Sequence, residues 1–247
     1  MSRHILTLVS AVAALASVAE AEPVRILAYG DSNTWGWTPT PEGFPAERLP
    51  DQARWAGVLD DALGDEVEVV VDGLVGRTTT LDAAGAIGPL SPVTFNGGEG
   101  LAASIARNGP IDLVIVMLGT NDLQAGVERS PEDVAAAAFD LADIATSAKE
   151  LAFSSYAAPK ALVVAPPPYG DTSATPLTGL FAAGEAPSAQ LGAAFEAEAE
   201  RRGAAYVDAG GFIETDGVDG VHFTAETHRT LGLSLVKPVA ALIADED

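Results

Sequence analysis

The stretch Val24-Arg25-Ile26-Leu27-Ala28-Tyr29-Gly30-Asp31-Ser32 decides how this chain folds, because an apolar run leads directly into a polar turn. The run 24–29, closed by Gly30, is typical of a buried strand. A strand-to-helix turn after it would project the Ser32 hydroxyl above the edge of a sheet, near the positive end of a helix. Taken alone, however, Gly-Asp-Ser is more typical of a plain turn or a helix cap.

Four further apolar runs of the same kind follow along the chain. They are rich in β-branched residues, end at Gly, Pro or Asp, and cover residues 67–71, 111–118, 161–165 and 204–207. Runs that are apolar throughout, rather than alternating, indicate strands buried on both faces, as in a parallel sheet.

Helical patterns separate these runs, at residues 54–63, 99–107, 130–148, 187–202 and 224–243. The clearest begins at Ser130-Pro131-Glu132-Asp133, with an N-cap serine, a proline at the first position and acids in the first turn. In the last pattern, Pro238 is expected to bend or split the helix. The alternation predicts one doubly wound α/β domain, a three-layer sandwich around a five-stranded parallel sheet.

The first 21 residues have the character of a separate leader. Basic Met1-Ser2-Arg3-His4 precedes an apolar run at 5–18, and Ala19-Glu20-Ala21 gives a small-x-small cleavage pattern. This order predicts a secretory signal peptide at 1–21, with 22–247 as a single domain exported to the periplasm or the medium. A membrane anchor is less favoured because the run is shorter than the roughly 20 residues of a spanning helix. A third alternative is an N-terminal helix packed on the domain.

The charge balance restricts the partners. The chain carries 13 basic and 35 acidic residues, a formal net charge of −22. Such a surface repels nucleic acid and anionic lipid, so we expect neither nucleic acid nor, once the leader is removed, a membrane as partner. The acidity is compatible equally with salt adaptation and with solubility. The absence of cysteine excludes thiol catalysis and Cys-ligated zinc.

Only three histidines are present. His4 lies in the leader, and His228 lies in the last helical pattern without an acid placed to orient it, so we expect it at the surface. His222 follows Asp219 by three residues in a glycine-rich loop, close enough for the carboxylate to fix the tautomer of the ring. Asp216 is a rival for that role at a less natural distance. Ser32, His222 and Asp219 together have the composition of a catalytic triad for acyl transfer.

Two further segments supply candidate donors for an oxyanion. Asn121, in Gly119-Thr120-Asn121-Asp122, follows a buried strand, and its amide can donate to a carbonyl oxygen that becomes negative. Its neighbour Asp122 is expected to hold the loop in place. The backbone amides of Ser32 and Gly76 would complete the hole, with Gly73 assigned to a structural turn.

Five blocks in this order resemble the SGNH (GDSL-type) hydrolases, most closely the bacterial arylesterase and acyltransferase branch. The blocks are GDSNTWGW at 30–37, GLVGRTT at 73–79, MLGTND at 117–122, APKALVVAPPP at 158–168 and DGVDGVHFT at 216–224. The resemblance covers nearly all of 22–247 and assigns the four named residues of the superfamily to Ser32, Gly76, Asn121 and His222. It implies a flavodoxin-like sheet, no metal or cofactor, and hydrolysis of small aryl or alkyl esters. Similar members also pass the acyl group to alcohols or to peroxide.

Two features depart from that branch. The leader is not general in it, and the Gly- and Ala-rich segment 172–186 puts in doubt the contacts through which some members assemble into oligomers that narrow the site. A homo-oligomer therefore remains open. The lipase elbow Gly-x-Ser-x-Gly is absent because position 34 is threonine, which disfavours an ordinary α/β-hydrolase.

The loops expected around Ser32 (38–50, 82–98 and 166–187) and the first motif are rich in apolar residues. The predicted pocket residues are Trp35, Trp37, Phe44, Phe95, Tyr169, Leu177, Leu180 and Phe181. Such a lining favours a small apolar ester as substrate over a sugar ester. The alternatives are a carbohydrate O-deacetylase, a thioesterase or lysophospholipase, and an inactive secreted binding module.

Overall fold

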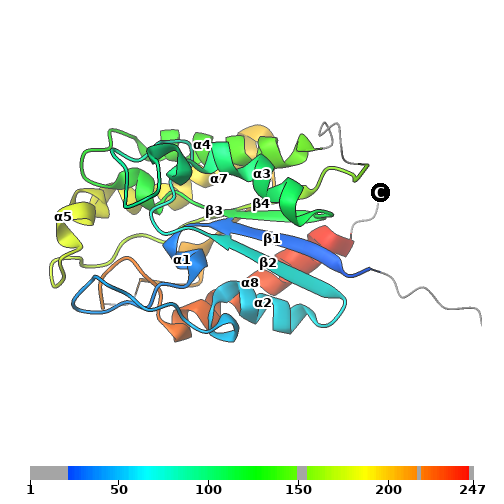
Figure 1. The fold of residues 1–247 in the computed structure, drawn as a ribbon, viewed down its shortest axis with the longest axis horizontal. Coiled ribbons are helices and arrows are strands. Elements are labelled where there is room, and N and C mark those ends of the chain that lie inside the picture. The colour runs from blue at the N-terminus through cyan, green and yellow to red at the C-terminus, as the bar shows by residue number, and fades with distance from the viewer. Residues whose placement is uncertain (1–21, 149–154, 216–217, 245–247) are drawn as a thin grey trace, which may run out of the picture.

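The central sheet has five parallel strands in the order β2-β1-β3-β4-β5 (Figure 1). The computed structural model describes residues 22–148, 155–215 and 218–244. The strands are β1 (Val24–Gly30), β2 (Val67–Gly73), β3 (Leu113–Met117), β4 (Lys160–Ala165) and β5 (Tyr206–Asp208). The predicted leader at 1–21 and the rival acid Asp216 lie outside the described residues.

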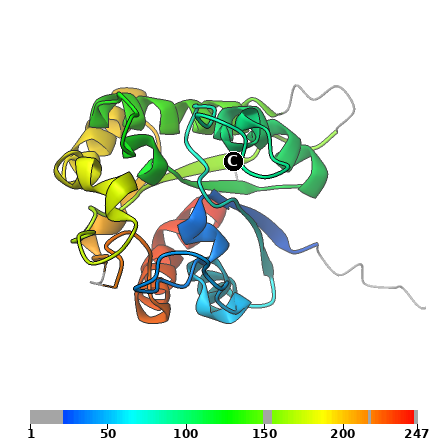
Figure 2. The same ribbon diagram turned by 60° about the vertical axis from the view of Figure 1, so that its left-hand side comes forward.

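Helices cover both faces of this sheet, as Figures 1 and 2 show. One face carries α2 (Trp55–Leu63) and α8 (Ala225–Ala244), and the other carries α3 (Gly97–Asn108), α4 (Pro131–Thr146) and α7 (Leu191–Arg202). The predicted doubly wound, three-layer α/β fold is therefore confirmed.

Shorter helices lie mostly in the loops. The α-helical turns are α1 (Ser32–Trp35), α5 (Thr178–Phe181) and α6 (Glu185–Ser188). The 3₁₀ turns are η1 (Asp51–Ala53), η2 (Pro92–Phe95), η3 (Thr120–Leu123), η5 (Ala182–Gly184) and η6 (Ala209–Gly211). The predicted helix 187–202 is thus divided between α6 and α7. In contrast, Pro238 does not split α8, which runs through it.

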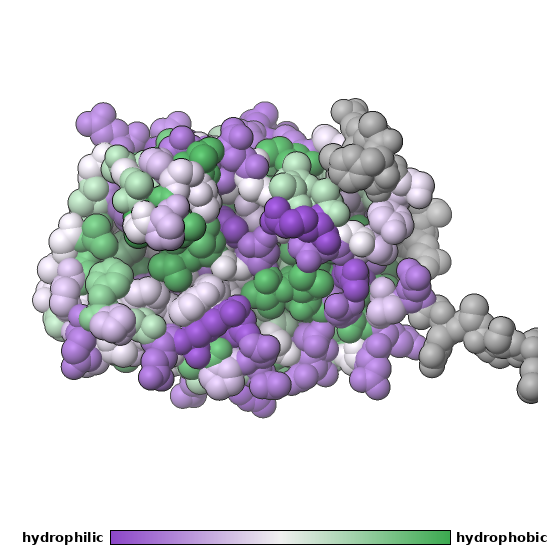
Figure 3. Space-filling model, in the orientation of Figure 1, coloured by the Kyte–Doolittle hydropathy of each residue, from purple (hydrophilic) through white to green (hydrophobic). Residues whose placement is uncertain are grey.

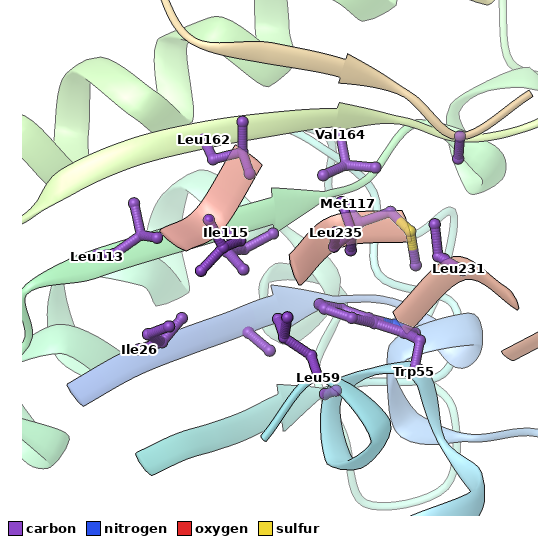
Figure 4. Close-up of a cluster of buried hydrophobic side chains, with 14 of the residues drawn as sticks. Ile26, Trp55, Leu59, Leu113, Ile115, Met117, Leu162, Val164, Leu231 and Leu235 are labelled. Carbon is purple, nitrogen blue, oxygen red and sulfur yellow. The ribbon is translucent and has the colours of Figure 1, made fainter. Parts of the chain in front are cut away.

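The two faces of the sheet pack in separate apolar clusters because successive strand residues point in opposite directions. Below the sheet, Ile26, Ile115 and Met117 pack against Trp55 and Leu235 from α2 and α8 (Figure 4). Above it, the intervening residues pack against α3 and α4; they are Leu27, Tyr29, Val114 and Val116. Burial on both sides explains why these strands are apolar throughout.

His228 belongs to this core, so its expected place at the surface was wrong. Its side chain is 0% exposed, and its Nδ1 accepts a hydrogen bond of 3.2 Å from the backbone N–H of Trp55, at the start of α2. Burial, with the nearby Arg54 guanidinium, lowers the pKa of His228 to about 3. The packing of α8 against α2, which α8's own pattern does not show, accounts for the difference.

Strand register brings the candidate site residues together. Gly30 at the end of β1 pairs with Gly73 of β2 on one side and with Met117 of β3 on the other. The segments that follow these three strands therefore lie side by side at the carboxyl edge of the sheet, where α/β proteins form ligand sites. None of the helices within the described ranges has the length and apolar character needed to cross a membrane.

Candidate active site

Ser32 is the first residue of α1, immediately after β1. The Asp31 carboxylate caps the helix by accepting the backbone N–H of Asn33 at 2.9 Å. The turn is tight: a side chain on Gly30 would collide with the side chain of Thr34 and the carbonyl of Met117. As the first helical residue, Ser32 has a backbone N–H without an intrahelical acceptor. Burial raises the pKa of Asp31 to about 7, although the Asn33 hydrogen bond opposes this.

His222 lies within hydrogen-bonding distance of both Ser32 and Asp219. Its Nε2 is 3.0 Å from Ser32 Oγ, and its Nδ1 is 2.8 Å from Asp219 Oδ2. All three side chains are buried. When the Nδ1–H of His222 donates to the Asp219 carboxylate, Nε2 is unprotonated and can accept the proton of the serine hydroxyl. The structure therefore joins the three residues that sequence spacing selected.

Asp219 is held as a carboxylate. Burial on its own raises the pKa of this group, but hydrogen bonds from the His222 ring and from the backbone N–H groups of His222 and Val221 outweigh it. Its Oδ1 accepts both backbone donors, at 2.8 and 2.9 Å. The pKa of Asp219 therefore lies below its ordinary value, and the negative charge faces the imidazole at neutral pH.

An aromatic ring packs on the face of the His222 imidazole, and a second ring packs against the first. The Trp37 ring stacks on the His222 ring with centroids 4.7 Å apart and planes inclined by 16°. Phe44 then contacts Trp37 edge to face at 5.3 Å. A nearly parallel indole restricts the tilt of the imidazole and presents a π-face to it.

Asn121, in η3, has a buried amide with several contacts. Its Nδ2 donates to the carbonyl of Arg77 at 3.0 Å and approaches Asp31 Oδ2 at 3.5 Å. Its Oδ1 accepts a hydrogen bond from Gln124 Nε2 at 2.6 Å. The second Nδ2 contact is at the limit of a hydrogen bond, so this N–H is weakly held.

The two glycines after β2 have different surroundings. A side chain at Gly73 would collide with the backbone of Trp35, so this glycine permits the close approach of the β2 end to α1. Gly76 adopts a φ of +82°, which favours glycine, and lines the same pocket as Ser32, Asn121 and His222. Gly76 thus lies at the pocket wall near Ser32, and Gly73 serves the close packing of the turn.

The pocket at this site has a volume of about 810 Å³. Seven of the eight predicted pocket residues line it: Trp35, Trp37, Phe44, Phe95, Leu177, Leu180 and Phe181. Tyr169 does not. Its hydroxyl donates to the carbonyl of Thr120, and its ring packs edge-on against Phe181 at 5.6 Å, so it supports the wall from behind.

The rim of the pocket carries apolar side chains that are open to solvent. Ile87 and Leu90, from the loop before η2, are exposed together with Phe44 and Leu180. Figure 3 shows hydrophobic side chains gathered on the side of the molecule where α1 and α5 lie. The sequence predicted the loop 82–98 at the pocket but neither Ile87 nor Leu90, because the apolar pattern of a loop does not show which side chains face the pocket.

The family model described as the GDSL-like lipase/acylhydrolase family matches residues 28–230. The chain belongs to this family. The resemblance inferred from the sequence blocks is therefore confirmed, and the protein is an esterase or acylhydrolase of the GDSL superfamily.

Solved structures show the same fold over nearly their whole length. The aryl esterase of M. smegmatis is 40% identical, with 89% of this chain and 99% of that chain covered and a TM-score of 0.82. Est24, a carbohydrate acetylesterase from Sinorhizobium meliloti, is 37% identical, with the same coverage and a TM-score of 0.83. A comparison with curated proteins gives no match.

Asn33 is a site residue of this GDSL-family acylhydrolase that sequence reasoning missed. Its Nδ2 donates to the carbonyl of Val221, and its Oδ1 accepts the backbone N–H of Phe223, both at 3.2 Å. The residue after Ser32 therefore binds the backbone on both sides of His222. The amide beside the serine was the available signal, because an amide side chain can donate from its nitrogen and accept on its oxygen at the same time.

Asp122 has the supporting role expected for it. It accepts the backbone N–H and hydroxyl of Thr79 at 2.9 and 2.5 Å, and it pairs with Arg129 at 2.8 Å. These bonds fasten η3 to the segment that follows Gly76. The two loops that carry Asn121 and Gly76 are thereby held against each other.

Proposed function

We propose that this protein is a serine esterase that cleaves small apolar carboxylic esters through an acyl-enzyme. The observation that carries the proposal is the 3.0 Å contact between His222 Nε2 and Ser32 Oγ, with the Asp219 carboxylate on the other ring nitrogen. A nucleophile, a base and an orienting acid in this geometry are the requirements of covalent acyl transfer.

In the first half of the proposed cycle, His222 takes the proton from Ser32 as the hydroxyl oxygen attacks the ester carbonyl. The carbonyl oxygen becomes an anion, which receives hydrogen bonds from the N–H groups of Ser32 and Gly76 and from Asn121 Nδ2. His222 then gives the proton to the leaving alcohol or phenol, and the acyl group stays on Ser32.

In the second half, His222 activates a water molecule, which attacks the acyl-enzyme and releases the acid. An alcohol or a peroxide in the same place would take the acyl group instead of water. The largely apolar walls of the pocket, with Trp37, Phe44 and Phe95, favour an apolar acceptor or leaving group and limit competing water.

A carbohydrate O-deacetylase is the second candidate, supported by the 37% identity with Est24. The pocket lining opposes it, because sugar hydroxyls need polar partners that Trp37, Phe95, Leu177 and Phe181 do not supply. A thioesterase or lysophospholipase, and an inactive binding module, rank below it. The predicted export of the domain favours the deacetylase, the second candidate, because an exported enzyme can reach polysaccharide esters outside the cell.

The decisive experiment compares p-nitrophenyl acetate with acetylated xylan, for the wild type and Ser32→Ala. We expect rapid hydrolysis of the aryl ester, slow or no release of acetate from xylan, and loss of both in the variant with unchanged folding. Turnover retained by pure, folded Ser32→Ala would refute the mechanism. A preference for xylan would instead select the deacetylase. A long-chain acyl thioester is added as a third substrate, and a preference for it would select the third candidate.

A further inference from the structure

Gln124 makes a polar contact at the site and has no role in the catalytic cycle proposed above. It follows η3 directly, lines the pocket, and donates from Nε2 to Asn121 Oδ1 at 2.6 Å. It lies two residues beyond the Gly119–Asp122 block, so the sequence pattern gave it no role.

The backbone around Gln124 is fastened at several points. Its carbonyl accepts the N–H of Val127 at 3.0 Å, and the N–H of Ala125 donates to the carbonyl of Leu180 at 2.7 Å. On its other side, η3 is held through buried Asp122. The side chain of Gln124 therefore extends from a fixed turn, which lowers the entropy lost in holding its amide against Asn121.

The contact acts on the oxygen of an amide whose nitrogen is the proposed oxyanion donor. One Nδ2 hydrogen of Asn121 is committed to the carbonyl of Arg77, and the other meets Asp31 Oδ2 only at 3.5 Å. A donor on Oδ1 fixes the side-chain torsion. It also polarises the amide, and hydrogen bonds in such chains strengthen one another. The weakly held N–H thereby becomes a better donor to a developing negative charge.

We propose that Gln124 is a positioning residue that acts through Asn121 to strengthen the oxyanion hole. The proposal rests on the proposed function, since it assumes that Asn121 donates to the oxyanion. Gln124 need not touch the reacting atoms. Gln124 stabilises the site as negative charge develops on the carbonyl oxygen in the transition state. Its removal should therefore lower kcat and leave KM nearly unchanged.

The test is a double-mutant cycle on p-nitrophenyl acetate hydrolysis, using Gln124→Met and Asn121→Ala singly and together. Methionine keeps the length of the side chain but cannot donate. We expect Gln124→Met to lower kcat about fivefold to twentyfold with little change in KM, as for the loss of one hydrogen bond. In the Asn121→Ala background, the same change should lower kcat by less than twofold, because its partner is gone.

Two further variants separate positioning from folding. Gln124→Glu has nearly the same shape but places a carboxylate against Asn121 Oδ1, so its kcat should fall at least as far as that of Gln124→Met. Gln52→Met, at an exposed position of η1, is the matched control and should have wild-type kinetics. Melting temperatures are measured for every variant.

Equal losses from Gln124→Met in the presence and absence of Asn121 would overturn the proposal, because Gln124 would then act on the substrate or the fold. An unchanged kcat in Gln124→Met or Gln124→Glu would overturn it as well. The proposed function is judged separately, by wild-type turnover and its loss in Ser32→Ala in the same assay. An active wild type with an unaffected Gln124→Met refutes only the role of Gln124.

Discussion

His222 and His228 lie six residues apart in the chain, yet the fold gives them opposite surroundings. His222 lies in a loop at the carboxyl edge of the sheet, with Asp219 on one ring nitrogen and Ser32 on the other. His228 lies one turn into α8, enclosed in the core, where its Nδ1 accepts the Trp55 N–H. One ring lines the substrate pocket, and the other is excluded from it.

The difference shows that the role of a histidine follows from what faces its two nitrogens. A carboxylate behind His222 stabilises the positive charge that a general base acquires. His228 has no such partner, and burial with Arg54 nearby makes its protonation unfavourable. We therefore assign proton transfer to the His222 ring and capping of α2 to the His228 ring. Substituting each histidine in turn tests this assignment.

The largest expected effect is on activity, from His222→Ala. Without the base, kcat/KM for p-nitrophenyl acetate should fall by about 10² to 10⁴, the usual contribution of a positioned general base. The ring is also buried, and its removal leaves the buried Asp219 carboxylate with its backbone donors alone, so we expect some loss of melting temperature and read the activity per folded molecule. A variant that loses stability but keeps its turnover would reverse the assignment.

His228→Ala should show the opposite behaviour. It leaves the Trp55 N–H without its acceptor and opens a cavity in the core, so the free energy of unfolding should fall by about 2–4 kcal/mol. The kcat per folded molecule should stay near the wild-type value. His228→Asn keeps an acceptor near the position of Nδ1, and we expect it to lose less stability in urea unfolding. A large loss of kcat in folded His228→Asn would contradict a purely structural role.

The pH dependence of stability should sharpen the contrast. Because the pKa of His228 is lowered to about 3 in the folded protein, the unfolded chain binds the extra proton between that pH and about 6.5. The stabilisation by neutral His228 is therefore complete above pH 6.5 and is lost as the pH falls toward 3. The stability gap between the wild type and His228→Asn should narrow by up to about 1.4 kcal/mol per pH unit in that window.

The wild type must be compared with His228→Asn in this measurement, because Asp31 changes stability with pH in the opposite direction to His228. Its pKa is raised by burial to about 7, so its neutral form favours the folded state at low pH, and stability is lost as the pH rises through 7. The effects of His228 and Asp31 on the pH dependence of stability therefore partly cancel in the wild type. Urea unfolding at several pH values, for the wild type and His228→Asn in parallel, isolates the histidine. A gap that stays constant from pH 4 to 7 would contradict the lowered pKa.

The smallest expected effect concerns the ring stacked on His222. Trp37→Leu removes a π-face that can stabilise the imidazolium and restrict its tilt, so kcat should fall about threefold to thirtyfold. Trp37→Phe retains a ring and should recover part of the loss. If leucine and phenylalanine variants have equal kcat and differ only in KM, Trp37 serves the substrate and not the base.

Much of the site was predictable because its residues are marked locally. Ser32 and Asn121 each follow an apolar strand, and Asp219 lies three residues before His222. Parallel strands end at one edge of a sheet, so the fold class alone indicated that these groups meet. The family resemblance then assigned Gly76, whose positive φ explains why a glycine stands there.

The errors concern contacts that depend on packing between distant segments. His228 has no acid in the sequence placed to orient its ring, but its partner is a backbone N–H more than 170 residues away. Tyr169 lies in the expected loop, yet its hydroxyl is directed to the Thr120 carbonyl behind the pocket wall. Asn33 and Gln124 were missed because amide side chains form no recognisable spacing pattern, and their partners appear only when the loops are folded.

The central claim is that Ser32 is activated by His222, and covalent labelling tests it most directly. The wild type, Ser32→Ala and His222→Ala are treated with a fluorophosphonate probe, and the modified peptide is located by mass spectrometry. We predict rapid, stoichiometric modification of Ser32 in the wild type, none in Ser32→Ala, and modification slowed by at least about 10²-fold in His222→Ala. Equally fast labelling in His222→Ala, or labelling of the wild type at another residue, would contradict the claim.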